Sequence, residues 1–313
     1  MKQRALGKSG LQVSLVGLGC NNFGGRTDLE ASRSVIHQAL DLGITLFDTA
    51  DIYGELGGSE KIMGQVLGDR RKDIILATKF GMAMDRAGVL KGASRRYILS
   101  AAEASLQRLK TDWIDLYQLH VPDPLTPVEE TLRAMEDLIR QGKVRYIGCS
   151  NLAAWQVVEA QWTARRLGFN AFVSCQDEYS LLVRDPEREL LPAMEAHGLG
   201  LLPYFPLASG LLSGKYKRNQ MPERARLTTS KVLGERYLTN ANWEIVERLE
   251  DFCAKRGRSL LELAFSWLAA RPLVSSVIAG ATRPEQVEQN VKAVDWALTP
   301  EDTAEIDRLT KRA

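Results

Sequence analysis

Four ionisable side chains follow three consecutive apolar runs of this chain. Asp48 and Tyr53 lie in the segment FDTADIYG, and Lys79 and His120 come at the ends of the next two apolar runs. Each run is apolar enough to form a buried β-strand. In a barrel of parallel strands the carboxyl ends share one rim, where active sites collect. The sequence therefore predicts a candidate catalytic site built from these four side chains.

Each of the four residues also has a purely structural explanation. Asp48 could cap the turn that follows it, Tyr53 could be an aromatic residue of the rim, and His120 could be a structural histidine. Lys79 is harder to explain in this way, because a lysine at the end of an apolar strand needs a partner if it is buried. Asp48, one strand over, is the natural partner. The combination is more specific than any of its members.

The types of these residues allow more than one barrel chemistry. A glycosidase needs two carboxylates on opposite sides of a sugar, and Asp48 and Asp51 are too close in the sequence for that. Lys79 could form a Schiff base with a carbonyl compound. The aspartate, tyrosine and histidine around it favour instead a lysine that tunes a neighbouring group. Binding of a nicotinamide nucleotide would separate these possibilities.

Eight apolar runs, alternating with helix-like segments, must position these residues. The runs are nearly continuous in apolar residues, as expected for parallel strands that helices cover. Eight such units in 313 residues predict an α/β fold of the (β/α)8 (TIM) barrel type, with a doubly wound sheet as the competitor. Helical spacing is clear in segments 28–43, 94–110 and 128–143. The predicted strands span 13–19, 44–48, 73–80, 113–120, 144–150, 171–176, 200–205 and 275–280.

The glycines after the first predicted strand do not form a dinucleotide fingerprint. In GLGCNNFGG they are spaced GxGxxxxG rather than GxGxxG, and no helix starts directly on them. A Rossmann domain is therefore not expected.

Three features depart from a minimal barrel. A short amino-terminal piece with a GKSG turn predicts a hairpin ahead of the first barrel strand. The segment from Pro206 to about Asn240 is too long for an ordinary loop, and its glycine-rich, basic stretch ASGLLSGKYKR suits an anionic ligand. A further helix is expected over TPEDTAEIDRLT (299–310), which opens with a capping signal. No linker divides the chain, so residues 1–313 are expected to form one domain.

Composition narrows the classes of function. The net charge of +2 gives no basic stripe for nucleic acid, and no apolar stretch is long enough to span a membrane. The start MKQRALGKSG has no apolar signal region, so a cytoplasmic location is expected. The four cysteines are widely spaced and are expected to be packed free thiols. With three histidines and no HExxH motif, no metal site is expected.

Five motifs resemble those of the aldo-keto reductase family, in the same order and on the same elements. They are FDTADIYG, ATKF, DLYQLH, IGCSN and PYFPLASG. The similarity runs from about Gly7 to Leu309, and it is greatest to bacterial members related to potassium-channel β subunits. The resemblance implies a barrel that binds NADPH or NADH without a Rossmann domain and reduces an aldehyde or ketone, or oxidises an alcohol, by hydride transfer.

The resemblance also implies a role for each residue of the rim. Tyr53 is the expected proton donor, Lys79 the cation that stabilises its phenolate and lowers its pKa, and Asp48 the partner of Lys79. His120 is expected to orient and polarise the substrate oxygen. Residues 49–51 would shape the site.

The remaining motifs resemble a cofactor groove. Ser150, Asn151 and Gln176 are expected to bind the nicotinamide carboxamide, and Tyr204 to stack on the ring. Phe205 departs from the family pattern, in which a small polar residue stands there, so one contact to phosphate is expected to be missing. The loop over the pyrophosphate is expected to contain Pro206, Leu207, Gly210, Leu211, Gly214 and Lys215. The adenosine-phosphate region is expected to contain Gly280, Thr282, Arg283, Gln286 and Asn290.

Arg283 near a helix start suits a 2′-phosphate, so NADP(H) is the expected cofactor, with NAD(H) possible. The expected partner is a small carbonyl or alcohol substrate in an open, permissive pocket lined by loops 81–94 and 121–127 and by the segment after Pro206. The alternative function is a cofactor-sensing regulatory subunit like the channel β subunits. The substrate, the direction of reaction and the oligomeric state stay open.

Overall fold

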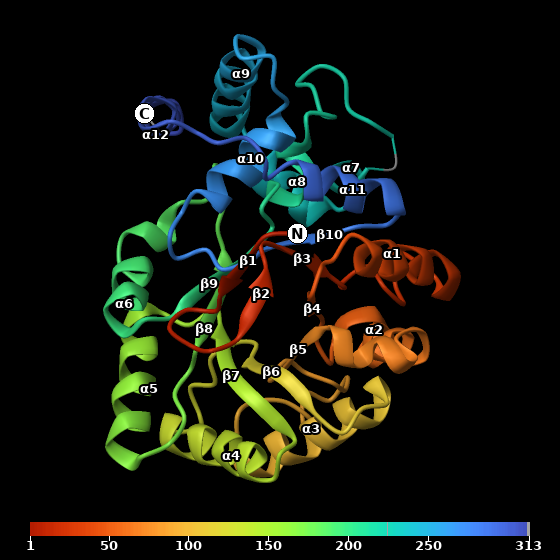
Figure 1. Ribbon diagram of the computed structural model, residues 1–313, viewed down its shortest axis with the longest axis vertical. Coiled ribbons are helices and arrows are strands. Elements are labelled where there is room, and N and C mark those ends of the chain that lie inside the picture. The colour runs from red at the N-terminus through yellow and green to blue at the C-terminus, as the bar shows by residue number, and fades with distance from the viewer. Residues whose placement is uncertain (224, 312–313) are drawn as a thin grey trace.

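The computed structural model describes residues 1–223 and 225–311, and its centre is a sheet of eight parallel strands. Their spatial order follows the chain, except that the last strand lies beside the first. The predicted α/β barrel is therefore the observed fold, and Figure 1 shows its ring of strands with helices outside. The strands are β3 (Val16–Gly19), β4 (Leu46–Asp48), β5 (Ile75–Phe80), β6 (Ile114–Leu119), β7 (Val144–Ser150), β8 (Ser174–Glu178), β9 (Gly200–Tyr204) and β10 (Val277–Gly280).

The ring closes between β9 and the residues just before β10. Leu201 donates its amide hydrogen to the Leu273 carbonyl at 2.7 Å, and Ser275 donates to the Leu201 carbonyl at 2.9 Å. A parallel bridge between Leu201 and Val274 joins the two segments. The carboxyl ends of all eight strands consequently meet at one end of the barrel.

Side chains alternate between the barrel interior and the helix layer, as the strand period requires. Leu46, Ala77, Leu116, Leu202 and Ile278 form a small interior cluster. The larger core lies between the strands and the surrounding helices. These helices are α1 (Leu29–Asp41), α2 (Tyr53–Val66), α3 (Arg95–Leu109), α4 (Val128–Arg140), α5 (Ala154–Leu167), α6 (Leu190–His197), α10 (Leu260–Ala269) and α11 (Pro284–Lys292).

An amino-terminal hairpin, β1 (Gln3–Ala5) and β2 (Gln12–Ser14), covers the end of the barrel opposite the carboxyl ends. Leu6 and Val13 from this hairpin complete the interior cluster. The expected first strand, 13–19, was wrong in its start, because its first residues belong to the hairpin. The break is fixed by Ser14, whose hydroxyl donates to the Val16 carbonyl at 2.7 Å and accepts from the Thr45 amide at 2.9 Å.

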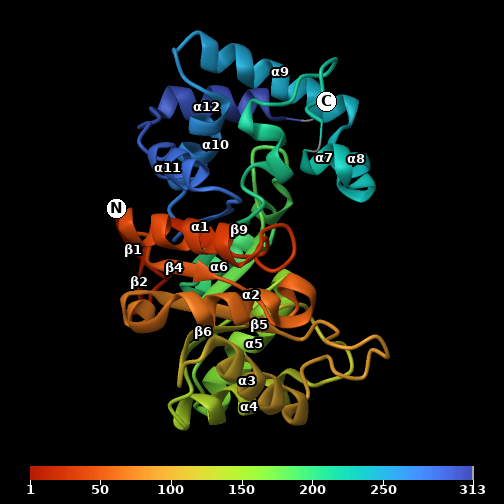
Figure 2. The ribbon, with the colours of Figure 1, turned by 90° about the vertical axis from the view of Figure 1, so that its right-hand side faces the viewer.

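Further helices lie after β9, where the sequence indicates an unusually long segment. It forms the 3₁₀ helix η3 (Ala208–Ser213), α7 (Arg226–Thr229) and α8 (Lys231–Tyr237), followed by α9 (Asn240–Ala254). The last helix, α12 (Pro300–Leu309), packs on α9 and begins with the predicted capping box of Thr299 and Asp302. Figures 1 and 2 both show α7 to α12 gathered on one side of the barrel. In residues 1–223 and 225–311, no helix combines the length and the apolarity that a membrane span needs.

Candidate active site

A cavity of about 700 Å³ opens at the carboxyl ends of the strands. Asp48, Tyr53 and His120 line it, while Lys79 lies beneath its floor and is fully buried. The fold therefore brings together all four residues that the sequence places on the barrel rim. Lys79 and Asp48 are neighbours because β5 follows β4 in the barrel.

Lys79 is paired with Asp48 at the centre of this group. Its Nζ donates to Asp48 Oδ2 at 2.6 Å and to the Thr49 carbonyl at 2.8 Å. Burial by itself lowers the pKa of Lys79, but the carboxylate of Asp48 and the phenol of Tyr53 outweigh burial and raise it above its ordinary value. The lysine therefore stays charged, and the pair is a buried, hydrogen-bonded ion pair.

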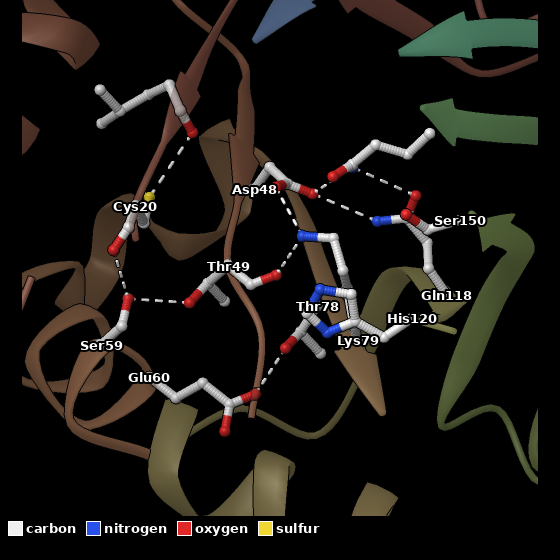
Figure 3. A network of polar contacts seen from close by, with 12 residues as sticks. Cys20, Asp48, Thr49, Ser59, Glu60, Thr78, Lys79, Gln118, His120 and Ser150 are labelled. Atoms are coloured by element: carbon white, nitrogen blue, oxygen red, sulfur yellow. Dashed lines mark hydrogen bonds and ion pairs between the residues drawn. The ribbon is translucent and has the colours of Figure 1, made fainter. Parts of the chain in front are cut away.

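Two glutamines hold the other carboxylate oxygen of Asp48. Gln176 Nε2 donates to Asp48 Oδ1 at 2.8 Å, and Gln118 Nε2 donates to the same atom at 3.2 Å. Gln176 also donates to Gln118 Oε1 at 3.4 Å. Figure 3 shows Gln118 and Lys79 reaching Asp48 from different strands. The sequence interpretation missed Gln118, although it lies two residues before His120 and alternation points both side chains to the same face.

Tyr53 lies over the ammonium of Lys79 and beside His120. Nζ of Lys79 is 5.0 Å from the Tyr53 ring centroid, and the Tyr53 and His120 rings meet edge to face with centroids 5.7 Å apart. Burial raises the pKa of the Tyr53 phenol, and the nearby lysine opposes this shift without cancelling it. The expectation that Lys79 lowers the pKa of Tyr53 below its ordinary value is therefore wrong, because the net shift is upward. The phenol stays protonated at neutral pH and can donate a proton.

His120 is a neutral imidazole in this environment. Burial and then the charge of Lys79 lower its pKa to about 3. Its Nδ1 is buried and has no hydrogen-bonding partner within residues 1–223 and 225–311. A neutral imidazole at the cavity wall can donate a hydrogen bond from its N–H group to a substrate oxygen.

The backbone after Tyr53 is left-handed for four residues. Their φ angles are 67° at Gly54, 60° at Glu55, 65° at Leu56 and 104° at Gly57. A Cβ at Gly54 would lie 2.3 Å from the carbonyl oxygen of Phe23. Only glycine fits where this turn meets the loop after β3, and the turn fixes the point at which Tyr53 leaves the barrel rim.

Asn151 connects two other expected nicotinamide residues, Ser150 and Tyr204, to His120. It has a left-handed φ of 60° and follows the end of β7. Its Nδ2 donates to the His120 carbonyl and to Ser150 Oγ, both at 3.0 Å, and the Tyr204 hydroxyl donates to its Oδ1 at 2.8 Å. Asn151, Ser150, Gln176 and Tyr204 all line the cavity. Polar amides and one aromatic ring therefore stand beside the catalytic candidates.

Most of the other expected cofactor residues also line the cavity. Leu211 and Gly214 are the two that do not. Leu211 is fully buried in the core, and Gly214 is the C-cap of η3. Thr282 and Gln286 are joined by hydrogen bonds of 2.8 and 3.2 Å at the start of α11. The remaining expected residues in the lining are Pro206, Leu207, Gly210, Lys215, Gly280, Arg283 and Asn290.

Loops 81–94 and 121–127 do not line the cavity, contrary to expectation. They bind each other instead. The Asp123 carboxylate accepts hydrogen bonds from the Ala93 amide and the Thr126 hydroxyl, both at 2.8 Å. The segment after Pro206 does contribute lining residues.

Four cations line the cavity, and the sequence interpretation missed two of them. Arg26 and Arg226 join the expected Lys215 and Arg283 in the lining. Burial and then the neighbouring Arg26 and Arg283 lower the pKa of Lys215, and burial and then Arg26 lower that of Arg226. Arg283 is 4.0 Å from Glu285, and no ion pair joins the other three to a carboxylate in the described residues. Such a cluster fits an anionic ligand with several charges.

The other unexpected polar residues of the lining come from the loop after β3, from η3 and from α11. Only the fold brings these segments together. They are Asn21, Asn22, Ser209, Ser213 and Gln289.

Residues 15–311 match the aldo/keto reductase family. The chain is 40% identical to a probable voltage-gated potassium channel subunit beta of Arabidopsis thaliana, over 96% of this chain and 94% of that protein. It is 38% identical to the uncharacterized oxidoreductase YrpG of Bacillus subtilis, over 96% and 93% of the two chains. It is 35% identical to L-glyceraldehyde 3-phosphate reductase of Escherichia coli K12, over 98% and 92%.

Proposed function

The chain belongs to the aldo/keto reductase family and is an oxidoreductase, and we propose that it reduces aldehydes or ketones to alcohols, or catalyses the reverse reaction, with Tyr53 as the proton donor. The observation that carries this proposal is the buried Asp48–Lys79 pair under the phenol of Tyr53, at the floor of a cavity with four cations in its lining. Burial of two charges costs free energy that only good geometry and hydrogen bonds offset, so a buried ion pair in a cavity indicates a functional site.

The residues of the cavity fit a nicotinamide dinucleotide. Amide groups of Asn151 and Gln176 suit its carboxamide, and the Tyr204 ring offers a stacking surface. Arg26, Lys215 and the neighbouring arginines offer cations to its phosphates. When bound, the reduced dinucleotide supplies the hydride.

The chain's own side chains provide the proton and the polar environment. Tyr53 donates its phenolic proton to the substrate oxygen as that oxygen gains negative charge. The ammonium of Lys79 stabilises the phenolate that remains, and Asp48 with its two glutamine donors holds the ammonium in place. Neutral His120 donates a hydrogen bond to the same oxygen and so fixes the carbonyl toward Tyr53.

NADP(H) is the proposed cofactor, with NAD(H) as the alternative. Arg283 stands at the N-cap of α11, on the cavity wall, and its nearest carboxylate is 4.0 Å away. A guanidinium at a helix start suits a 2′-phosphate. We further propose a small carbonyl or alcohol as substrate. A cytoplasmic location is also proposed, because all four cysteines are buried free thiols.

A fluorescence titration with NADPH and with NADH, followed by an aromatic aldehyde such as 4-nitrobenzaldehyde in the same cuvette, tests the proposal. Tight NADPH binding and its oxidation on addition of aldehyde are the expected result. A protein that binds neither nucleotide would contradict the proposed function.

A cofactor-sensing role is the second candidate, because one relative at 40% identity is named a probable channel β subunit. The same titration distinguishes the two functions. Tight binding with turnover far below about 1 s⁻¹ on every aldehyde tried would favour the sensing role over catalysis.

A further inference from the structure

Arg226 is a partly buried cation that has no anionic partner among residues 1–223 and 225–311. It lines the cavity at the start of α7, and burial followed by the charge of Arg26 lowers its pKa. Within residues 1–223 and 225–311, its guanidinium takes part in no hydrogen bond or ion pair. It contacts an aromatic ring, since its Cζ lies 4.9 Å from the centroid of Phe205. A guanidinium held this way keeps its donors free for a ligand.

Phe205 occupies a backbone conformation that disfavours a bulky side chain. Its φ is +51°, in the left-handed region, directly after Tyr204 at the end of β9. Glycine or asparagine would fit this conformation at lower cost. A strained aromatic residue on a cavity wall points to a role that outweighs the strain.

The ring of Phe205 packs against the core and contacts both Tyr204 and Arg226. The Phe205 ring meets the Tyr204 ring edge to face with centroids 5.2 Å apart, and it also contacts the guanidinium of Arg226. Phe205 therefore lies between Tyr204, the expected stacking surface for the nicotinamide, and Arg226, one of the cations in the cavity lining. General packing does not require the aromatic face, because leucine would supply a similar apolar volume.

We propose that Phe205 is a positioning residue that holds the guanidinium of Arg226 toward the diphosphate of the bound dinucleotide. This inference rests on the proposed function. Stacking restricts the arginine before the ligand arrives, and such preorganisation strengthens binding.

Calorimetric titration with 2′-phospho-ADP-ribose tests the proposal, because this fragment has the diphosphate and no nicotinamide. Phe205→Leu should weaken its binding about 3- to 30-fold, as expected for loss of a cation–π contact. Phe205→Tyr keeps the aromatic face and should bind within about twofold of the unchanged protein. Arg226→Gln should weaken binding at least as much as Phe205→Leu, and its log Kd should depend less steeply on log salt concentration.

The double variant identifies the mechanism. If Phe205 acts through Arg226, then Phe205→Leu should have almost no effect in an Arg226→Gln background. Additive effects of the two substitutions would overturn the proposal, as would an unchanged fragment affinity in Phe205→Leu. Phe205→Asn, which tolerates the left-handed backbone, serves as a second variant if Phe205→Leu does not fold.

The measurements distinguish failure of the proposed function from failure of the proposed role of Phe205. If the unchanged protein binds neither NADPH nor the fragment, the proposed function fails and this inference with it. If the unchanged protein binds both and the Phe205 variants bind equally well, only the role of Phe205 fails. The role of Phe205 would also be overturned if Phe205→Leu raised the KM for an anionic aldehyde and left the affinity for the fragment unchanged. Arg226 would then face the substrate rather than the diphosphate.

Discussion

The Nζ of Lys79 lies 2.6 Å from Oδ2 of Asp48, and neither side chain is more than 4% exposed. The pair is fixed further by the Thr49 carbonyl on the lysine and by two glutamine amides on the aspartate. This network supplies a positive charge under Tyr53 that water does not screen.

Removing one member of this pair should destabilise the protein strongly. Lys79→Met leaves the Asp48 carboxylate buried without its cation, and the free energy of unfolding should fall by about 3–5 kcal/mol. The double variant Asp48→Asn, Lys79→Met removes both charges and should be less destabilised than the sum of the single variants. Denaturant unfolding measures all three, and strictly additive losses would argue against a tight pair.

Asp51 should make stability depend on pH. Burial and then Glu60 raise the pKa of this carboxyl to about 7. The native state therefore holds a proton that the unfolded chain releases near pH 4, and the stabilisation is present below that pH and is lost as pH rises through about 7. Thermal unfolding of the protein and of Asp51→Asn, from pH 4 to 8, should show the difference. The Asn variant should gain relative stability across this range, by the order of 2–4 kcal/mol at most.

His120→Ala should impair the chemical step with little change in cofactor affinity. A neutral imidazole contributes a hydrogen bond to the substrate oxygen, and its loss should lower kcat by about 10²- to 10³-fold. Steady-state kinetics and NADPH titration give the two values. A histidine that serves only the structure would show instead as lost folding stability with normal turnover in the folded fraction.

Arg283→Ala should weaken the binding of NADPH more than that of NADH, because only NADPH has the 2′-phosphate. The expected loss for NADPH is about 10- to 100-fold, the size of a charge-assisted hydrogen bond to phosphate. Arg166→Ala on α5, an exposed arginine outside the cavity, is a matched control. Equal losses for the two nucleotides would remove Arg283 from the 2′-phosphate site.

The sequence predicts the barrel and the four rim residues well because both depend on short local patterns. Apolar runs mark the strands, and the residue that ends each run lies on the rim of any parallel barrel. Asp48, Lys79 and His120 needed no more than this, and Tyr53 lies in the loop that follows Asp48.

Other features of the site depend on contacts between distant segments of the chain. Local sequence patterns do not predict such contacts. Arg226 lies in a long segment without strand or helix periodicity, so nothing local places it beside Phe205. Gln118 looks like one more strand residue until the barrel brings it within 3.2 Å of Asp48. The direction of the pKa shift of Tyr53 depends on whether burial outweighs the charge of Lys79, and the extent of burial follows from the whole fold.

Tyr53→Phe tests most directly whether Tyr53 is the proton donor, because it removes one hydroxyl and keeps the ring beside Lys79 and His120. NADPH affinity and single-turnover reduction of an aldehyde should be measured on the same preparation. NADPH affinity should be nearly unchanged, and the rate of reduction should fall by about 10²- to 10⁴-fold. Reduction at the original rate by a folded, NADPH-binding Tyr53→Phe protein would contradict the role of Tyr53 as proton donor.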